Sequence, residues 1–283
     1  MSTPAPPPRL TVIFAREAHK AVIIRRGPAS YARLSLWDTD TDMVEHGQWL
    51  RGRVYENKCD LSPDGLLFVY FALQEHERRQ SQEEGYTGTY TAISRPPYFT
   101  ALGLWVEHGT YTFGGRFIDN QTVFVGHECE EAHANHQPPG WLKCVGFDVI
   151  RDASPEHTAH YNAGWIADAP TNVKNPTWNI DIVLNAHKPD PAGRYVLERQ
   201  QAHEYGDIVT IYALVDTKTD KRTEITGKVA QMDWDQRGRL ICVSEGKLWA
   251  RDPADPNAKG TLIEDFNGQT FEPIASPDWA KQW

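Results

Sequence analysis

The chain has 283 residues, of which 40% are hydrophobic and 24% are charged, and its formal net charge is −9 at pH 7. These values allow a packed core and exclude a chain that is disordered throughout. The acidic balance and the scattered Lys and Arg argue against nucleic-acid binding, which needs basic residues gathered on one face. No stretch approaches the roughly 20 apolar residues of a membrane-spanning helix, so we expect no nucleic-acid and no membrane partner.

The chain begins with a proline-rich segment, residues 1–9, that has no apolar periodicity and favours an extended, solvated conformation. The apolar run Leu10 to Ala15 lacks the basic leader and cleavage site of a secretion signal. The cysteines show no Cys-x-x-Cys spacing, so disulfides are not expected; they are Cys59, Cys129, Cys144 and Cys242. We expect residues 1–9 to be a disordered tail, residues 10–283 to form a single domain, and the protein to be cytoplasmic.

Short segments rich in β-branched and aromatic residues, bounded by Gly, Pro, Asp or Asn, predict strands. In chain order these segments are TVIFA (11–15), AVIIRR (21–26), ARLSLW (32–37), LLFVYFA (66–72), YTAI (90–93), QTVFVG (121–126), NIDIVLN (179–185), RYVLE (194–198), IVTIYALV (208–215) and RLICVS (239–244). No segment of helical length keeps an apolar period of 3.6 residues between capping residues. The sequence therefore predicts an all-β fold.

Two distant parts of the chain share one pattern of strands and turns. Each has two strands, a third strand that ends in Asp-Thr-x-Thr-Asp, a Gly-basic-Val step, and a turn before another strand. Asp38 of the first part matches Asp216 of the second, a separation of about three units of roughly 59 residues. Further turn landmarks are Asp64-Gly65, Asp119-Asn120 and Ser276-Pro277-Asp278. The pattern indicates repeated units of about four short strands, the content of one propeller blade.

The turn Ser62-Pro63-Asp64-Gly65 stands before an apolar strand, where Pro63 presets φ and Gly65 accepts a positive φ. This turn resembles the blade pattern of TolB-like and tryptophan–aspartate-repeat β-propellers, and the resemblance covers about 200 residues by pattern. It implies a small β-propeller of about five four-stranded blades, in which N-terminal strand material completes the last blade. Four or six blades, a large β-sandwich or paired β domains remain alternatives.

The stretch GHECEEAHANHQ, residues 126–137, is the densest group of metal-ligating side chains. If the strand before it continues, His127 and Cys129 share one face, and His133 and His136 could turn back toward them. Such a set would suit tetrahedral zinc, although the spacing matches no zinc pattern. The alternative interpretation, which we favour, is a solvated insertion loop that ends at the following prolines.

Carboxylates at equivalent repeat positions are candidates for an axial catalytic pair, because glycoside cleavage needs two carboxyl groups at a defined separation. These candidates are Asp60, Asp119, Asp181, Asp233 and Asp235. Turn formation and backbone hydrogen bonding explain the same residues without catalysis. Most of the ten tryptophans fit packing between sheets, but Trp105 and Trp165 stand beside glycine-rich loops, where we expect exposed, ligand-binding side chains.

The sequence contains no G-x-S-x-G elbow, phosphate loop or G-x-G-x-x-G motif. We therefore predict a non-catalytic propeller scaffold that binds a partner, a protein in the first place or a small molecule. The alternative is a glycan-directed hydrolase that uses axial carboxylates or a bound metal. The hydrolase requires at least two carboxylates, or three metal ligands, within one pocket.

Overall fold

The computed structural model describes residues 6–27, 30–74, 88–126, 131–146, 163–168, 171–173, 181–204 and 207–283. These residues form strands joined by turns, and the described part of the chain contains no α-helix. The all-β prediction is confirmed. Within the same residues no helix is long and apolar enough to cross a bilayer. The chain divides into two compact units, Met1–Ala159 with Phe266–Trp283, and His160–Asp265.

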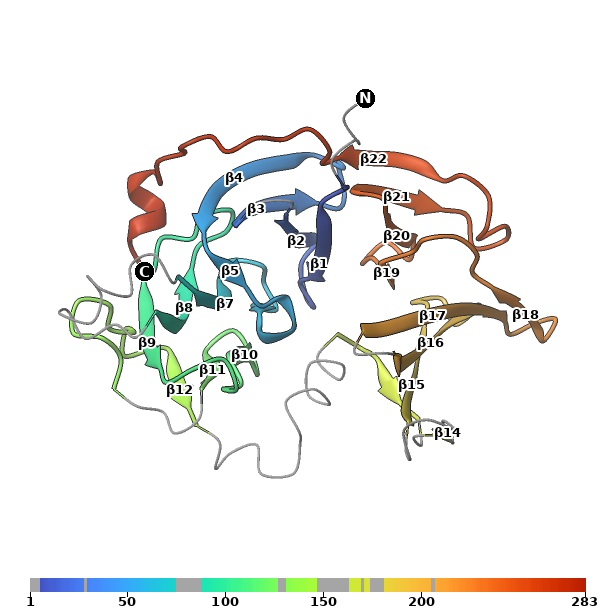
Figure 1. Cartoon of the computed structure of the whole chain (residues 1–283), viewed down its shortest axis with the longest axis horizontal. Helices are drawn as coiled ribbons and strands as arrows, with labels where there is room; N and C mark the ends of the chain where they lie inside the picture. The colour runs from blue at the N-terminus through green and yellow to red at the C-terminus, as the bar shows by residue number, and fades with distance from the viewer. Residues whose placement is uncertain are drawn as a thin grey trace. The chain divides into compact units, whose positions relative to one another are not determined.

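The first unit begins with an antiparallel sheet in which four consecutive strands pair in chain order, the β1–β4 sheet (Figure 1). Its strands are β1 (Arg9–Phe14), β2 (Lys20–Arg26), β3 (Tyr31–Asp38) and β4 (Val44–Arg51). Five consecutive residues of β2 are buried, from Ala21 to Arg25. A strand covered on both faces needs a continuous apolar run rather than an alternating one, which explains why AVII predicts a strand.

Two further sheets complete the first unit. The β5–β9 sheet has the order β5-β7-β8-β9, and β6 pairs with β7; its strands are β5 (Arg53–Val54), β6 (Asp60–Leu61), β7 (Phe68–Leu73), β8 (Thr89–Ser94) and β9 (Gly103–Glu107). The β10–β12 sheet joins β10 to β11 antiparallel and β11 to β12 parallel; its strands are β10 (Gly115–Phe117), β11 (Thr122–Val125) and β12 (Lys143–Val145). Two 3-10 helices, η1 (Glu56–Lys58) and η4 (Asp278–Lys281), belong to the same unit.

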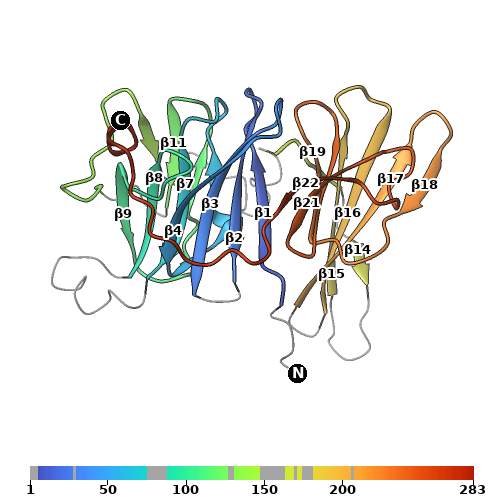
Figure 2. The ribbon, with the colours of Figure 1, turned by 90° about the horizontal axis from the view of Figure 1, so that it is seen from above.

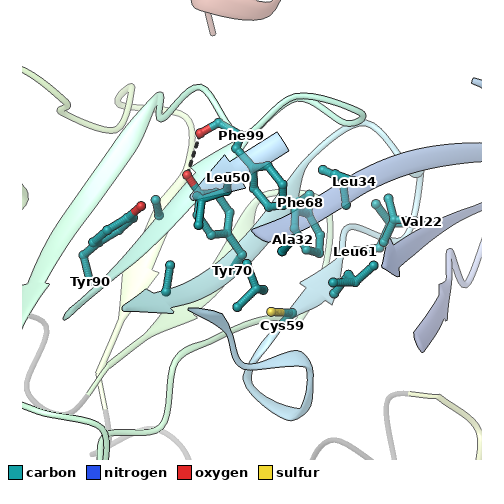
Figure 3. Packing of buried hydrophobic residues seen from close by; sticks show 14 of the residues in the cluster. Val22, Ala32, Leu34, Leu50, Cys59, Leu61, Phe68, Tyr70, Tyr90 and Phe99 are labelled. Atoms are coloured by element: carbon teal, nitrogen blue, oxygen red, sulfur yellow. Dashed lines mark hydrogen bonds between the residues drawn. The ribbon is translucent and has the colours of Figure 1, made fainter. Parts of the chain in front are cut away.

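The β5–β9 sheet lies between the other two sheets of the unit, and strand β7 shows why. Phe68 and Tyr70 face the β1–β4 sheet, where Figure 3 shows them packed with Leu34 and other buried side chains. Val69 points the other way and packs with residues of the β10–β12 sheet such as Phe117. All three side chains of β7 are at most 1% exposed. The run LLFVYFA therefore needs apolar residues on both faces.

The second unit contains two antiparallel sheets. The β13–β18 sheet has the order β13-β15-β16-β17-β18, with β14 paired to β15; its strands are β13 (Ile166–Ala167), β14 (Thr171–Val173), β15 (Asp181–Pro189), β16 (Tyr195–Glu204), β17 (Asp207–Asp216) and β18 (Lys221–Glu224). The β19–β22 sheet is a meander of β19 (Gln231–Trp234), β20 (Leu240–Ser244), β21 (Lys247–Arg251) and β22 (Thr261–Asp265). Leu197 and Leu214 of the first sheet pack against Met232 and Leu240 of the second.

The turns that the sequence pairs have matching conformations. Asp38 ends β3 and Asp216 ends β17, and each carboxylate accepts a hydrogen bond from the N–H two residues later, at 2.9 Å in both cases. The last Asp of each Asp-Thr-x-Thr-Asp run has a positive φ, 59° at Asp42 and 53° at Asp220. The turn predicted at Asp64-Gly65 is also present, with a φ of 71° at Gly65.

The prediction that N-terminal strand material completes the last sheet is wrong for the described strands. Strand β1 pairs with β2, and the β19–β22 sheet is built entirely from its own four strands. Ser276-Pro277-Asp278 does not lead into a strand either, because η4 begins at Asp278.

After β22 the chain becomes an irregular segment, Phe266–Trp283, that belongs to the first unit. Figure 2 shows this segment, in red, passing across the β1–β4 strands toward β9. Arg25 Nε donates to the carbonyl of Phe266 at 3.1 Å, and Arg95 Nε donates to the carbonyl of Gln282 at 2.9 Å. Hydrogen bonds to its backbone thus fasten the segment at both ends.

Candidate ligand-binding site

A pocket of about 330 Å³ lies on one face of the β13–β18 sheet and is formed entirely by residues of the second unit. The pairing of strands β15, β16 and β17 determines which residues form the floor of the pocket. Gln200 of β16 pairs with Asn185 of β15 on one side and with Ile211 of β17 on the other. Directly opposed residues point to the same face of an antiparallel sheet, so these side chains line one row of the pocket.

The next row toward the far end of β15 holds the ionisable side chains. His187 of β15 lies opposite Glu198 of β16, and Ala213 of β17 completes the row. His187 Nδ1 lies 2.9 and 3.1 Å from the two carboxylate oxygens of Asp168. Arg222 Nε donates to Glu198 at 2.8 Å. The pocket therefore contains one ion pair, Glu198 with Arg222, and one hydrogen-bonded pair, His187 with Asp168, beside the row that holds Asn185 and Gln200.

The opposite face of the same sheet is packed. Arg199 stands 4.3 Å from the ring centroid of Trp165, and Tyr212 lies opposite it on β17. Burial lowers the pKa of the Arg199 guanidinium and raises the pKa of Tyr212 to about 12. Tyr212 therefore keeps its neutral form near neutral pH.

Asp60, a predicted axial carboxylate, is a buried member of the first unit on β6. Its Oδ2 accepts hydrogen bonds from Arg16 at 3.2 Å and from the backbone N–H of Phe117 at 2.9 Å. Burial raises the pKa of Asp60, and the nearby Arg16 and Arg116 oppose that rise. Burial also lowers the pKa of Arg116 to about 10. This carboxylate joins β6 to β10 through hydrogen bonds within the unit.

Asp233 is buried on β19 of the second unit. Its Oδ1 accepts a hydrogen bond from Lys188 Nζ at 2.6 Å, and its Oδ2 accepts one from Trp165 Nε1 at 3.4 Å. The Lys188 side chain is 15% exposed and that of Asp233 8%. The ion pair links β15 to β19 and thus the two sheets of the second unit.

The other candidate carboxylates that the structure describes form turns. Asp235 is buried and accepts hydrogen bonds from the backbone N–H and from Nε of Arg239, at 2.8 and 2.7 Å. Asp119 is exposed and accepts the N–H of Gln121 at 2.7 Å, which lowers its pKa. Asp181 begins β15, and its side chain lies outside the described atoms. Asp60 belongs to the first unit, and Asp233 and Asp235 belong to the second.

The prediction that Trp105 and Trp165 are exposed is wrong. Trp105 is 4% exposed and packs between the β5–β9 and β10–β12 sheets, and Trp165 is 3% exposed beneath Arg199. Both neighbours of Trp105 on β9 point to the opposite face, where the strand is also covered. The glycines beside Trp105 did not indicate an exposed side chain, because strand β9 is covered on both faces.

The histidine stretch is described only in part, since His127 and Cys129 lie outside the described residues. His133 and His136 occupy a turn, with ring centroids 5.8 Å apart. The backbone N–H of His133 donates to Leu104 of β9 at 2.8 Å, and His136 Nδ1 lies 3.0 Å from the carbonyl of Ala101. Within the described ranges no three His, Cys, Asp or Glu residues are placed to bind one metal ion. Zinc binding by the full stretch stays a prediction.

Sequence reasoning missed the pocket residues altogether. In the segment Val196-Leu197-Glu198-Arg199-Gln200, period 2 places Glu198 and Gln200 on one face and Leu197 and Arg199 on the other. Apolar and polar residues do not alternate in this segment, so it gave no clear signal for a sheet with one polar face. Nothing in the sequence showed that Asp168 would meet His187, which lies 19 positions further along the chain.

Comparison with known proteins gives structural similarity only. No family model matches the chain, and no curated protein matches it. The chain is similar to the β-propeller domain of the Trilobed protease from Pyrococcus furiosus, a domain with an open velcro topology, at 8% identity and a TM-score of 0.34, over 87% of this chain and 83% of that one. It is also similar to an uncharacterized protein of Listeria monocytogenes EGD-e, at 9% identity and a TM-score of 0.29, over 98% of this chain and 88% of the other. Neither protein assigns a site or an activity to this chain.

Proposed function

We propose that this protein is a non-catalytic binding protein of the β-propeller type, with about five four-stranded blades, and that its pocket on the β13–β18 sheet takes a small molecule. The pocket itself is the observation on which the proposal rests. A volume of about 330 Å³ falls at the lower end of ligand pockets, which run from about 300 to about 1,000 Å³. Its few converging polar groups beside apolar walls match the usual make-up of such sites.

The succession of sheets supports the propeller part of the proposal. Among the described residues, five sheets follow one another along the chain, with three in the first unit and two in the second. Within each unit, neighbouring sheets pack face to face through buried apolar clusters. Blades of a propeller bury their faces in this way against the blades on either side.

The contacts of the carboxylates support binding rather than catalysis. Asp60 and Asp233 are buried and held by Arg16 and Lys188, and Asp235 is held by Arg239. These hydrogen bonds occupy the carboxylate oxygens within the fold, which gives the three carboxylates a structural role. The glycan-directed hydrolase stays an alternative prediction, and so does a protein partner at another surface.

A thermal-shift screen of neutral and charged metabolites tests the proposal. A compound at 100 times its Kd stabilises the folded protein by about 2.7 kcal/mol, which raises Tm by several degrees. Ile211→Arg fills the pocket from a side chain that is 48% exposed, and Leu262→Arg makes the same change at a residue 45% exposed on β22. We expect a stabilising compound whose effect Ile211→Arg removes and Leu262→Arg retains. If every shift survives Ile211→Arg, the pocket is not a binding site.

A further inference from the structure

The charge of the pocket depends on which face of the β13–β18 sheet each side chain occupies. Successive residues of a strand point to opposite faces, so Arg199 points away from Glu198. The guanidinium of Arg199 lies 4.3 Å from the ring centroid of Trp165 on the packed face, and it does not belong to the pocket. The ionisable side chains of the pocket face are Asp168, His187, Glu198 and Arg222.

The pocket face carries an excess of negative charge. With histidine counted as neutral, its two carboxylates, Asp168 and Glu198, exceed its one guanidinium, that of Arg222, by one charge. The guanidinium is itself bound to Glu198 at 2.8 Å, so an anion would have to compete with a carboxylate for it. The field of the lining therefore favours a ligand that is a cation.

The hydrogen-bonding groups of the lining present acceptors to a ligand. An ionised carboxylate only accepts hydrogen bonds, so His187 Nδ1 is the donor to Asp168 at 2.9 Å, and Nε2 of the neutral ring is left as an acceptor. Glu198 accepts from Arg222 through Oε2, and its Oε1 has no hydrogen bond to any described residue. His187 and Glu198 are directly opposed across β15 and β16, which places their side chains side by side. The Gln200 amide oxygen adds an acceptor in the next row.

The kind of cation follows from the rest of the lining. Among the lining residues that the structure describes there is no Trp, Tyr or Phe, and these are the rings that cage quaternary ammonium groups, which have no N–H. A protonated primary amine instead brings N–H donors to the acceptors of β15 and β16. Strand β17 contributes the apolar residues Ile211 and Ala213, and the Ile211 side chain is 48% exposed. An aliphatic stem on the ligand would cover it.

We propose that the pocket binds a protonated primary amine that carries an aliphatic stem. This inference rests on the proposed function, because it names the ligand class of the same pocket. The ammonium group donates to Glu198 and to His187 Nε2, which lie in one row of the sheet. The stem lies against Ile211 of the next strand. Carboxylate and imidazole thus select the charge of the ligand, and β17 selects its apolar part.

Saturation-transfer NMR titrations on the full-length protein test the ligand class. The probes share one pentyl stem and differ in the head group: pentylamine, pentan-1-ol, pentanoate and pentyltrimethylammonium. The amine and the alcohol differ in charge at nearly the same size. The quaternary ion keeps the charge of the amine but has no N–H to donate.

Two pairs of variants locate the binding. Glu198→Gln removes a pocket charge at a side chain that is 40% exposed. Its matched control is Glu224→Gln, because Glu224 also accepts from Arg222, at 3.3 Å, but is 72% exposed and lies outside the lining. Ile211→Ser shortens the apolar wall, and Leu262→Ser makes the same change in kind at a residue 45% exposed on β22. All four positions are exposed, so the variants should fold.

We expect pentylamine to bind about tenfold more tightly than pentan-1-ol and pentyltrimethylammonium, and pentanoate to bind least. Glu198→Gln should raise the Kd of pentylamine about threefold to fivefold, since the carboxylate is partly screened by water. Ile211→Ser should raise the Kd of the amine and of the alcohol alike, and both controls should leave it within about twofold.

Three results would overturn the inference. Binding of the alcohol, the anion or the quaternary ion as tight as that of the amine would refute the ligand class and leave the pocket as a binding site. Amine binding that ignores both Glu198→Gln and Ile211→Ser would place the amine elsewhere. No binding by any probe refutes the inference as well, and the metabolite screen then decides separately whether the pocket binds anything.

Discussion

The ion pair between Lys188 and Asp233 gives the sharpest test of whether a candidate carboxylate is structural. Both side chains are largely buried, at 15% and 8% exposure, and their Nζ and Oδ1 atoms lie 2.6 Å apart. Replacing Lys188 with Met keeps the length of the side chain but leaves the Asp233 carboxylate without its cation. Removing one partner of a buried pair costs about 3–5 kcal/mol. Because Lys188 is still partly exposed, water can reach the carboxylate in the variant. We therefore expect a loss of stability at the lower end of this range, about 3 kcal/mol.

A double-mutant cycle separates the pair from the packing around it. Asp233→Asn should cost less than Lys188→Met, since the flexible Lys188 stem can carry its ammonium toward water. The double variant should lie within about 1 kcal/mol of the wild type, because it buries no uncompensated charge. The summed costs of the two single variants should exceed the cost of the double variant by about 2 kcal/mol or more, which is the coupling energy of the pair. Such coupling would identify Asp233 as a structural group that joins β15 to β19.

The assay is hydrogen exchange of amides in β19 and β20, which reports opening of the second unit by itself. A loss of about 3 kcal/mol accelerates exchange through global opening roughly 100-fold, since every 1.4 kcal/mol is a factor of ten. Lys247→Met is the matched control in the same unit. Its pair with Asp265 has a similar distance, 3.0 Å, but exposures of 35% and 39%, so it should cost about 0–1 kcal/mol. Equal effects of the two Met variants would refute the structural role of the buried pair.

Three further changes have definite expected outcomes. Tyr70→Phe removes a buried hydrogen bond of 2.6 Å to a backbone carbonyl; it should cost about 1 kcal/mol by urea denaturation, while Tyr111→Phe, at a side chain 98% exposed, should cost nothing measurable. Hydrogen bonds from Arg194 lower the pKa of Asp216, so the stability that they give is present above pH about 4 and is lost as the pH falls below it; the urea midpoint of Arg194→Gln should fall less between pH 5 and pH 2 than that of the wild type. Burial raises the pKa of the Cys59 thiol, so peptide mapping after iodoacetamide treatment at pH 8 should find Cys59 unmodified in the folded protein and alkylated in urea. A folded sample alkylated at Cys59 would contradict the packing shown in Figure 3.

The sequence missed strands of two kinds, short buried strands such as β9 and β10 and exposed strands such as β18 and β22. Every segment expected to be a strand overlaps a strand of the structure, including LLFVYFA at β7. The missed β18 has the sequence KRTE, with three of four residues exposed. The missed β22, TLIED, is likewise largely exposed. Edge strands of this kind are specified by backbone pairing to a neighbour rather than by their own apolar pattern, so composition alone does not reveal them.

The site was harder to predict than the fold, because a binding pocket depends on residues from several strands in register. Asp60 and Asp233 were singled out from repeat spacing, and the structure gives each a cation from a distant segment that the spacing could not show. Trp105 was expected at the surface from its local glycine, yet strand β9 is covered on both faces. The pairing of His187 with Glu198 depends on the register between β15 and β16. A shift of one residue in that register would send the two side chains to opposite faces.

The alternation along β16 separates the residues that hold the fold together from those that line the pocket. Leu197 is fully buried against the β19–β22 sheet, whereas Glu198 and Gln200 face the pocket and Gln200 is exposed. Truncating Leu197 to Ala should cost about 2–5 kcal/mol, as for other core leucines. Truncating the exposed Gln200 should stay within about 0.5 kcal/mol of the wild type. A Gln200 variant that alters ligand affinity therefore reports on the pocket and not on unfolding, so binding and stability can be tested independently on strand β16.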